Sequence, residues 1–175
     1  MFKGTTMTDY LLDSEELTWV TSKNLAKNRL VAAVMLKFFQ AEGRYLENDD
    51  PISLELVISL AKQLDIDVKE FDITEQQWNN RSIERFRQEI RQLLNYRRAT
   101  VSDSQQLVKH LTQDNNILTM TSAKQLEKAY EFFKLHKLEP LKITEIRKYI
   151  TTAVTQVEAD IFAKITNSLS IDTKE

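Results

Sequence analysis

Apolar residues recur along most of this chain at the three- and four-residue spacing of amphipathic helices. The stretch from Leu30 to Phe39 is apolar nearly all round, which predicts the buried central helix of a first lobe. This helix is expected to begin near Ser22 and to end at Gly43, because glycine readily adopts the left-handed conformation that follows a helix. Pro51 then disfavours helical backbone at the residue before it.

Further apolar stripes predict the other helices of an all-α protein with two small helical lobes. The last stripe runs from Ile146 to Ile165. Two glycines and two prolines in 175 residues are too few for the turns of a sandwich, a barrel or an α/β fold. We expect a first lobe of residues 1–98 and a second of residues 99–175. The remaining helices are expected at residues 53–64, 68–71, 75–95, 104–112, 122–136 and 144–169.

The segment from Leu60 to Phe71 has the spacing of a helix-turn-helix. Ala61 is small where a second helix would pack closely, and Ile66 and Phe71 are apolar where that motif packs on the first helix. Asp65 stands at the turn position that glycine usually takes, and aspartate tolerates left-handed backbone better than most residues. The sequence therefore predicts a helix-turn-helix-like unit in the first lobe.

Composition excludes several classes of protein. There is no cysteine, which rules out disulfides, zinc fingers and thiol nucleophiles and makes a reducing cytoplasm the expected compartment. No apolar run is long enough to span a bilayer, so no membrane role is expected.

Candidate catalytic residues are scarce. The two histidines, His110 and His136, lie in separate predicted helices without an acidic residue at metal-ligand spacing. The sequence holds no glycine-rich phosphate loop and no nucleophile elbow. We therefore expect no catalytic residues, no cofactor and no metal ion in this chain.

Positive charge is concentrated in one segment of a chain whose formal net charge is −2. Residues 79–98 hold six basic and two acidic side chains. On a helical wheel, the residues opposite the apolar stripe are Arg81, Arg85, Gln88, Gln92 and Asn95. Arg81 and Arg85 are a like-charge pair that costs an isolated helix about 0.2–0.5 kcal/mol, and a polyanion would reverse that cost. The alternative is an ordinary solvated helix face, on which Glu84 and Glu89 neutralise much of the positive charge of the arginines.

Other cations form smaller groups. One group, at the start of the central helix, consists of Lys23, Lys27 and Arg29, and a further cation, Arg44, follows the end of that helix. Arg147 and Lys148 occupy the first turns of the last predicted helix, where the macrodipole disfavours cations; an anion would explain them, and Glu145 offsets them. The expected DNA-binding residues are Lys23, Lys27, Asn28, Arg29, Arg44, Arg81, Arg85, Gln88, Arg91, Gln92, Arg97 and Arg98.

Three stretches, NRLVAAVMLKFFQAEGRY, LAKQLDID and RQEIRQLLNYRRAT, in this order and spacing, resemble the N-terminal region of replicative transposases of the Tn-three type. The chain departs from the family at Val31, Asp65 and Asn95, where the family has glycine. The resemblance implies an all-helical region that recognises the terminal inverted repeats of a transposon in double-stranded DNA. It also implies that the catalytic domain lies downstream in a longer chain, whose later domains would be partners of this region.

Two questions stay open from the sequence. Either the predicted arginine helix or the short segment Val68–Phe71 would enter the major groove. The competing function is a helical interaction or dimerisation module that uses the stripe from Ile146 to Ile165.

Overall fold

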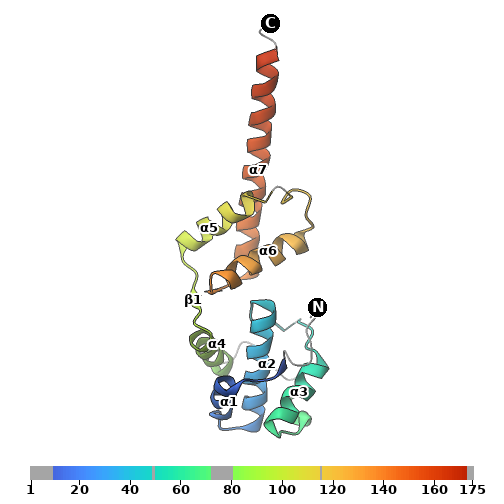
Figure 1. Ribbon diagram of the computed structural model, residues 1–175, viewed down its shortest axis with the longest axis vertical. Helices are drawn as coiled ribbons and strands as arrows, with labels where there is room; N and C mark the ends of the chain where they lie inside the picture. The colour runs from blue at the N-terminus through green and yellow to red at the C-terminus, as the bar shows by residue number, and fades with distance from the viewer. Residues whose placement is uncertain (1–9, 49, 72–80, 115, 173–175) are drawn as a thin grey trace. The chain divides into compact units, whose positions relative to one another are not determined.

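The computed structural model describes residues 10–48, 50–71, 81–114 and 116–172, with side chains described as far as Asn167. Within these ranges the chain forms seven α-helices and two strands of two residues each, which confirms the all-α prediction. It divides into two compact units, Met1–Tyr96 and Arg97–Glu175 (Figure 1). The division falls two residues before the expected one, because β1 (Arg97–Arg98) pairs in parallel with β2 (Leu138–Glu139) of the second unit.

The first unit is built around α2 (Ala26–Glu42), which contacts α1 (Ser14–Thr21), α3 (Leu54–Leu64) and α4 (Arg81–Leu93) (Figure 1). Every residue of α2 from Leu30 to Phe39 is buried, as its apolar pattern predicts. Gly43 follows the helix with a φ of 69° and donates its N–H to the carbonyl of Phe39 at 2.8 Å. The central helix and its glycine stop are therefore as expected.

One charged residue lies inside this apolar stretch. The Lys37 ammonium donates to Glu16 Oε2 of α1 at 2.7 Å, and the Gln40 amide donates to Glu16 Oε1 at 2.6 Å. Because all three side chains are paired, the buried charges of Lys37 and Glu16 are compensated within the unit.

The apolar pattern does not predict α1, although a capping box marks its start. Asp13 accepts hydrogen bonds from the N–H groups of Glu15 and Glu16 at 2.9 Å, and Glu16 accepts the N–H of Asp13 at 2.9 Å. Since α1 continues to Thr21, Ser22 caps its C-terminus and the α2 helix starts only at Ala26.

The expected helix-turn-helix is present only as far as its turn. Asp65 has left-handed backbone, with φ 52° and ψ 49°, and the N–H of Ile66 bonds the Ala61 carbonyl at 2.9 Å. The segment that follows is η2 (Val68–Glu70), a 3-10 helix of three residues. The described residues therefore show a single 3-10 turn where a second helix was expected, and the next residues, 72–80, lie outside the described ranges.

The second unit packs α5 (Val101–Thr112) and α6 (Ser122–Leu135) against the first half of α7 (Ile143–Asp172). Its core includes Leu107, Phe133, Ile146 and Ile150, all buried. The first part of the predicted Ile146–Ile165 stripe is therefore used inside this unit.

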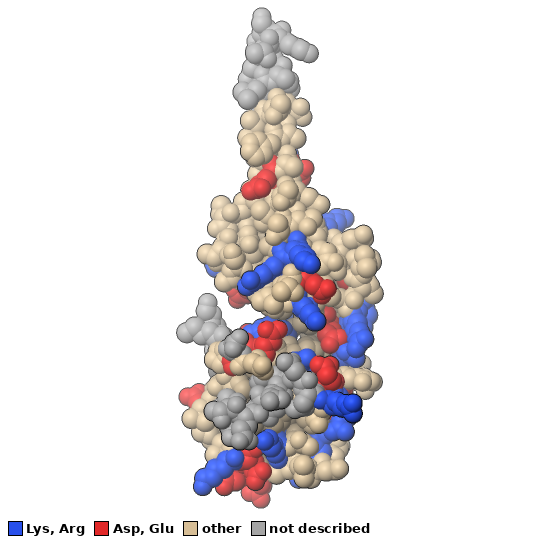
Figure 2. All heavy atoms as spheres, turned by 180° about the vertical axis from the view of Figure 1, so that it is seen from behind, with Lys and Arg blue, Asp and Glu red and all other residues tan. Residues whose placement is uncertain are grey.

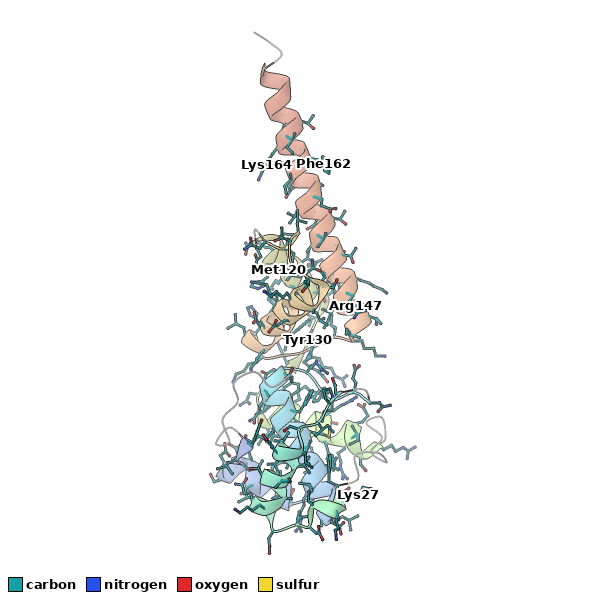
Figure 3. All side chains as sticks on the ribbon, turned by 90° about the vertical axis from the view of Figure 1, so that its right-hand side faces the viewer. Lys27, Met120, Tyr130, Arg147, Phe162 and Lys164 are labelled. Carbon is teal, nitrogen blue, oxygen red and sulfur yellow. The ribbon has the colours of Figure 1, made fainter. Side chains whose placement is uncertain are left out.

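The second half of α7 lies outside that core. All side chains from residue 158 to residue 167 are exposed, including Ile161, Phe162 and Ile165. The helix visibly continues beyond α5 and α6, and Phe162 and Lys164 lie on the extended part (Figures 1 and 3). The stripe is thus buried at its beginning and open to solvent at its end.

Candidate nucleic-acid interface

The arginine helix has one buried and one exposed face. Ile83, Phe86 and Ile90 of α4 are buried in the core of the first unit. On the opposite side five polar residues are exposed, and these form what we call the α4 outer face: Arg81, Arg85, Gln88, Gln92 and Asn95. The expected helix also included residues 75–80, which lie outside the described ranges. The α4 outer face is cationic and rich in amides, and the exposed Glu84 lies at its edge, where it pairs with Arg87.

Glu89 lies beside this face and is bound from the core side. Its carboxylate accepts the indole N–H of Trp19 at 3.0 Å and an ion-pair hydrogen bond from Lys23. The guanidinium Nε of Arg85 lies 3.7 Å from the other carboxylate oxygen, and 61% of the Arg85 side chain is exposed. Because Glu89 is shared with Lys23 and Trp19, it neutralises the outer face only in part.

Lys23 was expected to contact DNA, and the structure corrects this assignment. Its side chain is buried, pairs with Glu89 and places the ammonium 4.4 Å from the centre of the Trp19 ring. An ammonium held in this way stabilises the contact between α4 and the loop before α2 and cannot reach a phosphate. Lys23 is therefore no longer a candidate for contact with DNA.

Arg44 was also expected to contact DNA, and its side chain is likewise held by a partner within the unit. Its guanidinium binds Asp50 with two hydrogen bonds of 2.6 and 2.5 Å and lies 5.1 Å from the Phe38 ring centre. Burial raises the pKa of Asp50, but the hydrogen bonds from Arg44 and from the backbone of Glu47 outweigh it and hold the pKa below its ordinary value. Arg44 closes the loop after α2, and its side chain is only 24% exposed.

The cations at the start of α2 are partly accessible. Lys27, Asn28 and Arg29 are half-buried, and the Arg29 Nε donates to the Lys23 carbonyl at 2.7 Å. Lys27 lies near the beginning of the helix (Figure 3). Lys27 and Asn28 remain candidates for contact, whereas Arg29 holds the loop that precedes them.

The arginines that follow α4 differ in their surroundings. Arg91 is half-buried at the edge of the outer face. Arg97 donates two hydrogen bonds of 2.7 Å to Asp103, and with the Thr100 hydroxyl it holds the pKa of Asp103 well below its usual range. Arg98 is 80% exposed and its Nε lies 3.7 Å from Glu139. Arg98 is free to contact a ligand, while Arg97 mainly fixes β1 to the start of α5.

The part of the chain that the structure describes contains no cluster of three or more histidine, cysteine or acidic residues that could hold a metal ion. His110 and His136 both lie against the Phe132 ring, at 5.4 and 4.5 Å between ring centres. Among the described helices, none is long and apolar enough to cross a membrane.

A second group of cations lies on the second unit, of which sequence reasoning noted Arg147 and Lys148 but not Lys137 and Lys142. Lys137 and Lys142 are exposed on either side of β2, and Arg147 and Lys148 are exposed on the first turns of α7. Their spacing along the sequence gives no single helical face, so only the fold shows that they lie at one end of the second unit.

On the face of the molecule drawn in Figure 2, basic and acidic side chains lie interspersed on the first unit.

A family model described as a domain of unknown function, DUF4158, matches residues 4–153 of the chain. The match covers both units as far as the buried first half of α7. No curated protein and no solved structure matches the chain.

Proposed function

We propose that this chain, which belongs to the DUF4158 family, binds duplex DNA through the α4 outer face and has no catalytic activity of its own. The observation that carries the proposal is a helix face on which arginines and amides are exposed together. Arginine and lysine contact phosphates, and arginine and glutamine also bond base edges in the major groove. The same face would therefore supply both affinity and sequence recognition.

The dimensions of α4 suit this role. The major groove is about 12 Å wide and an α-helix with its side chains is about 10–12 Å across. From Arg81 to Gln92 the helix rises by about 16 Å, at about 1.5 Å per residue. The opposite face is anchored by three buried apolar residues, so the outer face is presented on a rigid element.

The electrostatics of the face also favour an anionic ligand. Arg81 and Arg85 repel each other at i,i+4 spacing, and Arg81 forms no ion pair with another residue in the described ranges. The residues that continue the line of the two arginines, Gln88 and Gln92, are uncharged, and the acids of the helix, Glu84 and Glu89, lie on either side of that line. A phosphate backbone would convert the repulsion between the arginines into attraction.

The resemblance to replicative transposases gives the proposal a biological setting. We infer that the cognate ligand is the terminal inverted repeat of a transposon. We also infer that strand transfer is performed by a catalytic domain in a longer chain. This region would then position the DNA end for that domain.

The test replaces Arg81 and Arg85 with alanine and measures binding to a duplex across a salt series. If each arginine contacts one phosphate, the slope of log K against log salt falls by about 0.9 per contact, or about 1.8 for the pair. The matched control replaces Lys62 and Lys69, two exposed cations of α3 and η2, with alanine. The thermal unfolding midpoint of both variants is expected to stay near that of the parent. An unchanged slope and affinity in the arginine variant would show that the α4 outer face is only a solvated surface.

The exposed end of the α7 stripe supports a second function, self-association. Two large apolar side chains of this end, Ile161 and Phe162, are exposed to solvent. Sedimentation equilibrium of the chain and of its Ile161→Asp variant at micromolar concentration separates the two functions. A concentration-dependent dimer that the variant abolishes favours association, and a monomer in both proteins removes it.

A further inference from the structure

One end of the second unit gathers five exposed cations from three segments of the chain. Arg98 lies on β1 in register with Glu139 of β2, Lys137 directly precedes β2, and Lys142 accepts the first backbone hydrogen bonds of α7. The last two members stand on the first turns of α7. We call this set the basal surface: Arg98, Lys137, Lys142, Arg147 and Lys148, all of them exposed.

The fold brings these cations together because β1 and β2 pair. Arg98 is 39 residues from Lys137 in sequence, yet the N–H of the neighbouring Arg97 bonds the Lys137 carbonyl at 3.0 Å. Lys137 has left-handed backbone, with φ 50°, at the point where the chain leaves α6 and turns into β2. The short parallel pair therefore fixes one cation from each strand region beside the start of α7.

Acidic neighbours do not neutralise this surface. Glu139 is half-buried and lies 3.7 Å from Arg98, and Glu145 is exposed in the first turn of α7. Lys137, Lys142 and the two α7 cations form no ion pair with another residue in the part of the chain that the structure describes. Two carboxylates against five cations leave a net positive surface.

The exposed side of α7 continues this surface. Arg147 points away from the two shorter helices of the unit (Figure 3). Beside it, Thr144, Thr151 and Thr155 are exposed and uncharged, and the next acid along the helix after Glu145 is Glu158. The helix macrodipole disfavours cations in the first turns of a helix, so Arg147 and Lys148 are placed unfavourably unless an anionic ligand binds them.

We propose that the basal surface is a second contact of this chain with duplex DNA and that it binds the phosphate backbone. This inference rests on the proposed function and extends it to the second unit. The surface is formed mainly by lysines, which act on phosphates as point charges, and it lacks the amide side chains of the α4 outer face. It would therefore add affinity and salt dependence without reading sequence.

Duplex DNA fits this surface better than an anionic membrane does. A helix that lies on a membrane inserts an apolar face between the lipid headgroups. In the first half of α7 that face consists of Ile146, Ile150 and Ala153, which are buried in the core of the unit. Only the polar side remains available, and it suits a hydrated phosphate backbone.

The test uses the whole chain with Lys142, Arg147 and Lys148 replaced by alanine. Binding is followed by fluorescence anisotropy with a labelled duplex between about 50 and 200 mM salt. The control replaces Lys109 and Lys124, which are exposed on α5 and α6 of the same unit, with alanine. If each of the three cations contacts one phosphate, the salt slope falls by up to about 2.7, and the loss of affinity is equal for specific and scrambled duplexes.

Each outcome has a separate meaning. A fall in slope in the triple variant but not in the control supports the proposal. If the parent chain binds DNA and the triple variant keeps the same slope, or loses no more than the control, the basal surface is not a contact. If the parent chain binds no duplex at all, the proposed function fails and this inference fails with it. The choice of partner would be overturned if the parent chain bound phosphatidylglycerol vesicles but not DNA, and if the triple variant did not bind the vesicles.

Discussion

Replacing Glu89 with glutamine is expected to weaken the fold of the first unit and to strengthen DNA binding at the same time. Glu89 compensates the buried Lys23 ammonium, and it also places a negative charge 3.7 Å from Arg85. The variant keeps an oxygen that can accept the Trp19 indole N–H but loses the charge. A fold contact and a ligand contact are therefore changed in opposite directions by one substitution.

The loss of stability follows from the burial of the lysine. Hydrogen bonds to charged groups contribute about 1.5–3 kcal/mol, and breaking a fully buried ion pair costs about 3–5 kcal/mol. Because 30% of the Glu89 side chain is exposed, the lower range applies and we expect a loss of about 2 kcal/mol. Urea unfolding followed by tryptophan fluorescence measures this loss.

The gain in binding follows from the charge removed beside the outer face. At about 7 Å in water, one unit charge and one phosphate interact by about 0.6 kcal/mol, so affinity should rise about two- to threefold. Glu84→Gln is the matched control, because it removes the same charge from α4 while the carboxylate is 63% exposed; its partner Arg87 also donates to the Leu46 carbonyl. The control should gain similar affinity and lose at most about 0.5 kcal/mol of stability. Equal stability losses in the two variants, or weaker DNA binding in either, would refute the reasoning.

Three further outcomes are expected. Arg44→Ala should lower the stability of the first unit, because Asp50 loses its two hydrogen bonds, and should leave the salt slope of DNA binding unchanged; a reduced slope would return Arg44 to the contact set. Asp103→Asn should destabilise the second unit at neutral pH. Because the folded pKa of Asp103 lies below its unfolded value of about 3.9, its contribution is complete above that value and is lost as pH falls below it, which an acid titration of the parent and variant would detect. Gly43→Ala should cost about 1 kcal/mol in thermal unfolding, since its φ of 69° disfavours a side chain, and no loss would contradict the assigned backbone.

The apolar pattern was enough to predict the fold class and the central helix. The run from Leu30 to Phe39 is apolar nearly all round, so it is buried only if other helices surround it. Gly43 marks the end of this helix because glycine readily adopts left-handed backbone. Helix α1 was missed because its short sequence has a weak apolar face; the capping box formed by Asp13 and Glu16 was the available indication of its start.

The candidate interface could be predicted only where the helical period decides exposure. That period placed Arg81 and Arg85 opposite the buried stripe. It could not show that Lys23 is buried against Glu89, 66 residues away, because that contact depends on how the loop before α2 packs on α4. Arg44 was misassigned although its partner Asp50 is close in sequence, since the loop geometry between them is not a periodic pattern.

The most direct test of the central claim is equilibrium binding of the whole chain to two duplexes of equal length. One carries the terminal inverted repeat that we propose as the cognate ligand, and the other carries the same bases in scrambled order. The account predicts that log K falls linearly with log salt for both duplexes and that the repeat binds more tightly at every salt concentration. Equal affinity for the two duplexes would contradict sequence recognition, and absence of binding at about 50 mM salt would contradict DNA binding altogether.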